Sequence, residues 1–171
     1  RIPLQHGLVM LSMLLAWPCM AASRNPAPGT FELVQSVPEK TNLAQPGMAR
    51  TRDVWLAMLG SARNRIDIAA FYLSNRKGEP LEPVLAALVE RARAGVKVRV
   101  LLDKSFMPQT QPSLGVLEGV PNITIRVLPM DVLTGGVLHA KFLVVDTRQV
   151  FVGSQNLDWR SFEQIHELGV R

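Results

Sequence analysis

The sequence predicts an α/β fold in which helices pack in layers against a mixed β-sheet. Runs of Val, Ile and Leu typical of strands alternate along the chain with segments whose apolar residues have helical spacing. The passage 66–102 has the order strand, helix, strand, which indicates a right-handed crossover between parallel strands. The 171 residues are 47% hydrophobic and 19% charged, enough for one domain with a buried core. We therefore expect an α/β/α layered sheet, covered by helices on both faces.

The individual elements follow from local patterns. An apolar stripe of Val54, Trp55, Met58 and Leu59 predicts one helix, and Gly95 in a C-cap position ends another. A nearly continuous apolar run indicates a central strand buried on both faces. The expected helices are 50–65, 80–94 and a short one at 113–117, with 106–112 as a connector. The expected strands are 31–37, 66–73, 96–102, 123–128, 137–146 and 150–153.

Residues 1–22 have the pattern of a secretory signal peptide. A basic first residue precedes the apolar run 8–17, and small residues follow around Ala21 and Ala22, the expected cleavage positions. The alternative is a buried N-terminal helix. Cleavage would remove Cys19 and one arginine, lowering the formal net charge from +5 to +4 and leaving no cysteine. We therefore expect a periplasmic or secreted protein that does not depend on disulfides.

The remaining chain divides into a linker at 23–30, rich in Pro and Gly, and a domain at 31–171. The apolar segment 168–170 reads as a strand entering the core, and the sequence stops directly after it at Arg171. Because domains seldom end at such a point, we expect the sequence to be the N-terminal half of a longer protein, truncated at its C-terminus.

The strongest chemical signal is the pair His139 and Lys141. The two residues lie two apart in the predicted strand, so their side chains should leave the same face. An ammonium group neutralises phosphate oxygens and favours a neutral, nucleophilic imidazole beside it. The alternative is a pair of solvated polar residues. A motif H-x-K-x4-D arises by chance in roughly one such chain in a hundred, so we favour the functional interpretation.

The residues around this pair extend the candidate site. Asp146 is five residues from Lys141, so we expect it to face the other way and to fix the strand end through hydrogen bonds. Gly153 and Ser154 leave the next strand in a small-residue turn. Backbone N–H groups, the Ser154 hydroxyl and the Asn156 amide can converge there on phosphate oxygens.

The motif H-x-K-x4-D followed by G-S-x-N resembles the signature of the phospholipase D superfamily. The wider sequence is similar to the branch that contains the animal lysosomal phospholipase-D-like 5′ exonucleases and the poxvirus envelope phospholipase-like proteins. The similarity lies in the segments 33–39, 67–72, 136–146, 152–161 and 167–170. This resemblance implies a phospholipase D-like fold, of which the chain forms one of two pseudo-symmetric halves.

The resemblance also implies a hydrolase that cleaves phosphodiester bonds through a phosphohistidine intermediate, without a metal or other cofactor. His139 would be the nucleophile or its general-acid counterpart. Glu167 matches a family carboxylate that is bonded to the catalytic histidine, and the less favoured alternative is a surface residue beside His166. The candidate catalytic residues are His139, Lys141, Asp146 and Glu167, and the candidate phosphate-binding residues are Lys141, Ser154 and Asn156.

The family's active site needs two such motifs, and the 171 residues contain one. The second would come from a missing C-terminal half or from a homodimer, as in the small single-motif nucleases, so the chain is expected to be inactive without a second motif. Two other functions stay open: a phosphatidyltransferase of the cardiolipin-synthase type, and a non-catalytic binding or scaffold protein. The sequence does not distinguish a phospholipid substrate from single-stranded nucleic acid, and the modest basic charge suits both.

Overall fold

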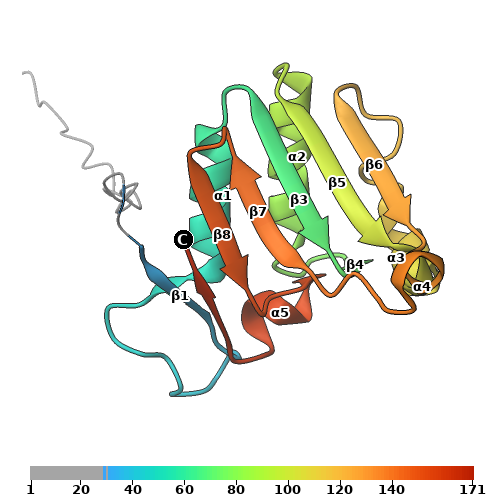
Figure 1. Cartoon of the computed structure of the whole chain (residues 1–171). Helices are drawn as coiled ribbons and strands as arrows, with labels where there is room; N and C mark the ends of the chain where they lie inside the picture. Colours follow the sequence, from blue (N-terminus) through green and yellow to red (C-terminus); the bar gives the residue numbers. More distant parts are fainter. Residues whose placement is uncertain (1–28, 30) are drawn as a thin grey trace, which may run out of the picture.

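The computed structural model describes residue 29 and residues 31–171, which form an eight-stranded mixed sheet with helices packed on it (Figure 1). The strand order is β2-β1-β10-β8-β7-β3-β5-β6, and β4 and β9 form a second, two-stranded sheet. The predicted signal peptide at 1–22 and all of the predicted linker except Gly29 lie outside the described residues.

The strands of the main sheet are β1 (Leu33–Ser36), β2 (Ala49–Arg50), β3 (Arg65–Ala70), β5 (Lys97–Asp103), β6 (Ile123–Leu128), β7 (Lys141–Val145), β8 (Gln149–Gly153) and β10 (Glu167–Val170). The second sheet contains β4 (Leu73–Ser74) and β9 (Leu157–Asp158). The helices are α1 (Thr51–Ser61), α2 (Glu82–Arg93), α3 (Met107–Leu114), α4 (Met130–Thr134) and α5 (Arg160–Glu163), with a 3-10 turn at Lys104–Phe106.

The strand directions bring many strand ends to one edge of the main sheet. Strands β3, β5 and β6 are parallel, which confirms the predicted parallel pairing across α2. Strand β7 runs antiparallel to both β3 and β8, and β10 runs antiparallel to both β8 and β1. One edge of the main sheet therefore carries the last residues of β1, β3, β5, β6 and β8 together with the first residues of β7 and β10. We call this edge, where strands end and begin, the catalytic edge.

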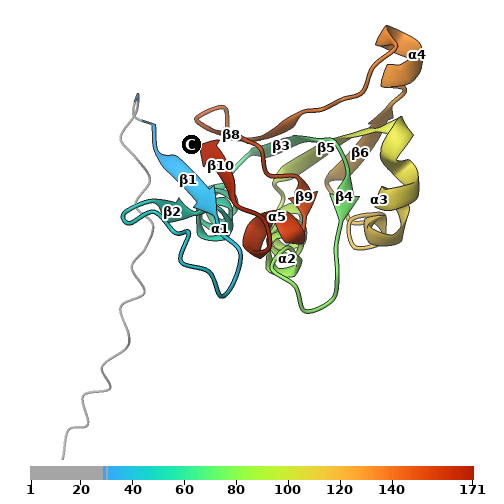
Figure 2. The ribbon, with the colours of Figure 1, turned by 90° about the horizontal axis from the view of Figure 1, so that it is seen from below.

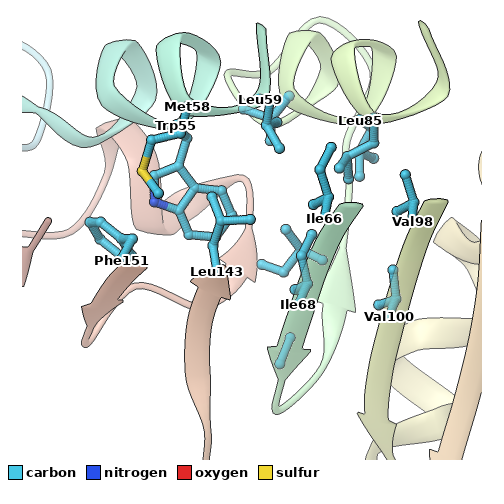
Figure 3. Close-up of a cluster of buried hydrophobic side chains, with 14 of the residues drawn as sticks. Trp55, Met58, Leu59, Ile66, Ile68, Leu85, Val98, Val100, Leu143 and Phe151 are labelled. Atoms are coloured by element: carbon cyan, nitrogen blue, oxygen red, sulfur yellow. The ribbon is translucent and has the colours of Figure 1, made fainter. Parts of the chain in front are cut away.

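Helices α1 and α2 cover one face of the sheet and bury the core against it (Figure 2). The predicted stripe on α1 is buried, and Trp55 packs edge-to-face on Phe151 of β8, with ring centroids 5.3 Å apart. Figure 3 shows these rings beside the aliphatic side chains that β3, β5, β7 and α2 contribute. Burial of this apolar surface supplies the main stabilisation of the fold.

No helix among residues 29 and 31–171 covers the strands on the opposite face, where α4 lies only at the end of the sheet (Figure 2). Its side chains include Phe142, Val150, Val152 and Leu168, which are 37–55% exposed. The predicted α/β class and mixed sheet are confirmed. The second helical layer of the predicted α/β/α arrangement is not seen within the described part of the chain.

Two boundaries differ from prediction for physical reasons. The expected strand 66–73 divides at Phe71 and Tyr72, because β3 pairs with β7 and β5 whereas β4 turns away to pair with β9. The connector expected at 106–112 instead belongs largely to α3, and the helix expected at 113–117 ends at Leu114. A proline in the first turn suits the start of α3, and the Thr110 hydroxyl accepts a hydrogen bond from the backbone N–H of Leu73.

The strand expected at 137–146 also begins later than predicted, at Lys141. His139 therefore precedes β7 and lies in an irregular segment. None of the helices that the structure describes is long and apolar enough to cross a membrane.

Candidate active site

Most of the candidate site residues gather at the catalytic edge. Lys141 is the first residue of β7 and Glu167 is the first residue of β10. Ser154 directly follows β8, and Asn156 lies between β8 and β9. His139 lies two residues before β7. Pairing of the strands thus brings together groups that are up to 28 positions apart in the sequence.

The His139 ring and the Lys141 ammonium meet on one aromatic side chain, Phe71. The His139 and Phe71 ring centroids are 4.8 Å apart, with the ring planes at 78°. The Lys141 Nζ lies 5.3 Å from the centroid of the same ring and donates to the His139 carbonyl oxygen at 3.4 Å. His139 is exposed and Lys141 is half-buried. The two groups therefore lie on the same side as predicted, although His139 is outside the strand.

Lys141 is placed to hold an anion. Burial lowers the pKa of its ammonium from the ordinary value, and the negative charge of Glu167 acts in the opposite direction. A partly desolvated cation interacts with phosphate oxygens more strongly than a fully hydrated one. An exposed imidazole beside such a cation can attack a phosphorus atom whose oxygens the cation holds.

Glu167, which the family resemblance places beside the catalytic histidine, is a half-buried carboxyl at the start of β10. The structure shows no hydrogen bond between Glu167 and His139 among the described residues, so the bond that the resemblance implies stays a prediction. Burial, and the nearby charge of Asp158, raise the pKa of the Glu167 carboxyl, while Ser161, Lys141 and Ser154 lower it. Its Oε2 atom is buried without a hydrogen-bond partner in the described part of the chain. Glu167 therefore faces Lys141 and the turn after β8.

The turn after β8 carries the polar groups of Ser154 and Asn156, and the backbone N–H of Ser154 is already hydrogen-bonded within the protein. The Ser154 backbone N–H donates to the carbonyl of Leu168 at 3.0 Å, so it does not point at a substrate. The exposed Ser154 hydroxyl lies 3.4 Å from the same carbonyl and can rotate. Asn156 is half-buried, and its Oδ1 has no partner among residues 29 and 31–171. This Oδ1 atom is a hydrogen-bond acceptor, so the phosphate-binding role expected for the Asn156 NH₂ group stays a prediction.

Asp146 lies at the far end of β7 from Lys141. Its carboxylate accepts hydrogen bonds from the backbone N–H groups of Arg63, Asn64 and Arg65 at 2.7–2.8 Å. Burial alone would raise the Asp146 pKa, but these three donors outweigh it and hold the pKa below its ordinary value. The expected role at a strand end fits this placement. The inclusion of Asp146 among the catalytic residues does not, because its oxygens are occupied away from the catalytic edge.

Three residues near the site were not predicted from the sequence to belong to it. Phe71 was predicted as part of a buried strand and instead contacts His139. Asp103, which ends β5, is fully buried and accepts hydrogen bonds from the backbone N–H groups of Ser105 and Leu138. Asp158 is 1% exposed and pairs with Arg160. The sequence did indicate one of them, because Asp103 is a carboxylate at the end of an otherwise apolar strand.

No group of three His, Cys, Asp or Glu side chains in the described part of the chain is arranged to hold a metal ion.

Comparison with known proteins decides the family. Residues 55–171 match the family described as "Cardiolipin synthase, PLD-like domain". The chain belongs to the phospholipase D superfamily. This confirms the resemblance that the H-x-K-x4-D and G-S-x-N motifs indicated.

Curated members of the superfamily share much of this sequence. The chain is 40% identical over 149 residues to the human "5'-3' exonuclease PLD3", in an alignment that covers 81% of this chain and 30% of that protein. It is 38% identical over 151 residues to "5'-3' exonuclease PLD4" of Mus musculus, covering 80% of this chain and 29% of that protein. The chain therefore spans less than a third of the length of these relatives.

Two solved structures have the same fold. The family member Nuc from Salmonella typhimurium superposes with a TM-score of 0.59 at 20% identity, covering 82% of this chain and 80% of Nuc. NucT from Helicobacter pylori superposes with a TM-score of 0.58 at 23% identity, covering 69% of this chain and 74% of NucT. At this level of identity, the likeness establishes the fold.

Proposed function

We propose that this chain is one catalytic half of a phosphodiesterase, with His139 as the nucleophile that forms a phosphohistidine. The observation that supports it most is the meeting of an exposed imidazole and a partly buried ammonium on the ring of Phe71 at the catalytic edge. A solvated pair with no function would not need this shared, half-buried aromatic contact.

The proposed reaction has two steps. A ring nitrogen of His139 attacks phosphorus, a P–N bond forms, and the P–O bond to the leaving group breaks. The leaving oxygen takes a proton from an acid that a second motif supplies. Water then attacks phosphorus and loses a proton to that same group, and the P–N bond breaks to restore the imidazole. Lys141 and the Asn156 amide hold the non-bridging oxygens in both steps.

The second motif is the missing component of this site. It comes either from a further part of a longer protein or from a second copy of this chain. The share of the curated relatives that this chain spans supports the first source. The small size of Nuc, of which the alignment covers 80%, makes the second worth testing.

For the substrate, we propose single-stranded nucleic acid. The curated relatives are named as 5'-3' exonucleases, which supports this choice over phospholipid. The name of the matched family keeps phosphatidyl transfer as the competing activity, in which an alcohol replaces water in the second step.

The test compares two histidine variants in the longest protein that the reading frame encodes. His139→Ala should lower the rate of oligonucleotide cleavage by about a thousandfold or more, because no other group replaces the nucleophile. His166→Ala is the matched control, since His166 is exposed on the same chain and has no proposed role. Vesicles of phosphatidylcholine and of phosphatidylglycerol test lipid hydrolysis and transfer. Equal cleavage by wild type and His139→Ala would refute the proposal.

The 171-residue chain itself distinguishes the two sources of the second motif. Activity that appears as the chain concentration rises indicates pairing of two copies. Activity that requires the longer protein at every concentration indicates a twin motif within one chain.

A further inference from the structure

The corner between β3 and β4 lies between the two segments of the proposed active site that this chain supplies, the H-x-K segment and the G-S-x-N segment. Ala70, the last residue of β3, pairs in register with Lys141. Leu73, the first residue of β4, pairs with Leu157, the residue after Asn156. Phe71 and Tyr72 occupy the corner between these two pairings, and both are half-buried. Two adjacent side chains thus lie between the H-x-K segment and the G-S-x-N segment.

The first corner residue, Phe71, contacts the H-x-K segment. One ring serves both His139, at a centroid distance of 4.8 Å, and the Lys141 Nζ, at 5.3 Å. Phe106 packs on the Phe71 ring with a centroid distance of 3.8 Å and limits its movement. An aromatic ring attracts a cation on its face and a ring edge-on, so Phe71 restricts both polar groups without forming a hydrogen bond.

The second corner residue, Tyr72, contacts the segment that follows Asn156. Its hydroxyl donates to Oδ2 of Asp158 at 2.8 Å, and burial with this hydrogen bond raises the pKa of Tyr72 to about 12. Arg160 donates to both oxygens of Asp158, at 3.0 Å from Nε and 2.6 Å from Nη2. Asp158 is therefore fully paired in its buried position, two residues after Asn156.

The three aromatic rings of Phe71, Tyr72 and Phe106 form a cluster of their own. Tyr72 and Phe106 stack with centroids 6.2 Å apart, and Phe71 and Tyr72 lie 5.6 Å apart. None of the three belongs to the main hydrophobic core that the described residues form under α1 and α2. A cluster outside the core, in contact with reactive groups, indicates a role in the site more than in the stability of the sheet.

We propose that the Phe71–Tyr72 corner is a positioning unit that sets the His139 and Lys141 pair relative to Asn156. The inference rests on the proposed function, because it assigns a purpose to the relative placement of those three residues. Phe71 orients the His139 imidazole, which attacks phosphorus, and the Lys141 ammonium, which neutralises the phosphate oxygens. Tyr72 fixes the segment that carries the Asn156 amide. Neither residue is itself catalytic.

Three variants separate this role from general packing. Phe71→Leu keeps apolar volume and removes the ring, and Tyr72→Phe removes the hydroxyl alone. Phe142→Leu is the matched control, because Phe142 is also adjacent to Lys141 in β7 but lies on the exposed opposite face of the sheet. All three are tested in the longest protein that the reading frame encodes, with melting curves recorded first.

Phe71→Leu should lower kcat about tenfold or more and change KM by less than about twofold, since small misplacements of reacting groups have large rate effects. The basic limb of its pH profile should move to lower pH, because the Lys141 ammonium loses the aromatic face that favours its charged form. Tyr72→Phe should act mainly on KM, because it loosens the segment that holds phosphate. Phe142→Leu should leave kcat, KM and the pH profile as in wild type.

A spectroscopic measurement decides the inference even if the proposed function fails. The Phe71 and His139 rings form a T-shaped contact with centroids 4.8 Å apart, so the Phe71 ring current should shift the His139 Hε1 and Hδ2 resonances. Phe71→Leu should move these resonances, whereas Phe142→Leu should not. Unchanged His139 resonances in Phe71→Leu would overturn the inference. Equal losses of activity in Phe71→Leu and Phe142→Leu would overturn it as well, since they indicate a general packing effect. If the wild-type protein cleaves no oligonucleotide but the His139 resonances do shift in Phe71→Leu, the proposed function is refuted and the contact of Phe71 with His139 stands.

Discussion

The carboxylate of Asp103 accepts a hydrogen bond from the backbone N–H of Leu138, the residue immediately before His139, at 2.5 Å. The same carboxylate accepts the N–H of Ser105 at 2.7 Å, in the turn that carries Phe106. Burial alone would raise the Asp103 pKa, but these donors outweigh it and lower the pKa from its ordinary value. One buried charge at the end of β5 thus holds both irregular segments that flank the His139 ring.

Asp103→Asn should destabilise the protein and loosen the segment before His139. The amide keeps the size of the side chain, but its NH₂ group is a donor that faces a backbone donor. We expect a loss of about 1–3 kcal/mol in the free energy of unfolding. Hydrogen exchange at the Leu138 amide should accelerate more than exchange in β5 itself. Glu118→Gln, at an exposed carboxylate, is the control and should change neither quantity.

Asp146→Asn should lose stability in a pH-dependent way. The folded pKa of Asp146 lies below its unfolded value of about 3.9, so its contribution is present above that pH and disappears as pH falls through the folded pKa. Urea unfolding at pH 7 should show the variant weaker by about 1–3 kcal/mol, and the difference should shrink below about pH 4. A difference that stays constant down to pH 2 would contradict this assignment.

Glu167→Gln should affect stability and activity in opposite directions. Burial raises the folded pKa of Glu167, so the folded state disfavours its charged form. The carboxyl contributes most below its unfolded pKa of about 4.3, and that contribution is lost as pH rises through the folded pKa. The glutamine variant should therefore melt higher than wild type at pH 7, with a smaller gain at pH 4. Its cleavage rate should fall, because Lys141 loses its neighbouring charge. A lower melting temperature at pH 7 would show that the attraction of the Lys141 charge outweighs the cost of burial.

Gly169→Ala should be among the more costly small substitutions in the domain. A Cβ at Gly169 would lie 2.4 Å from the ring of Phe151, which is fully buried against Trp55. Overpacking of this kind costs about 1–3 kcal/mol. Gly60→Ala is the matched control, because a Cβ there meets nothing within 4 Å and Gly60 lies in α1. It should instead stabilise by about 0.5–1 kcal/mol. Thermal melts of the two variants check both signs.

Much of the fold could be predicted because the signals are local. The stripe of Val54 and Trp55 identified α1, and the apolar runs identified β3 and β5. The bare face of the sheet could not be predicted, because strand patterns show which side chains are apolar and not what covers them. The start of α3 was missed because two prolines, Pro108 and Pro112, read as a connector although the first suits an initial helical turn.

The site was predictable at its motif residues and less so around them. His139 and Lys141 stand out in the sequence because their chemistry is unusual on a strand. The contact of Phe71 with both depends on β3 pairing with β7 over 70 positions of sequence, which no local pattern contains. The bond between Glu167 and His139 that the family resemblance implies is not among the contacts that the structure shows, so it stays a prediction.

The most direct test of the account is the identity of the residue that becomes phosphorylated. A single turnover on an oligonucleotide, quenched at alkaline pH where phosphohistidine survives, is followed by peptide mass spectrometry of the longest protein that the reading frame encodes. The account predicts a substrate-derived adduct on His139 that is absent from His139→Ala and retained in His166→Ala. An adduct on any other residue, or full turnover by His139→Ala with no adduct, would contradict it.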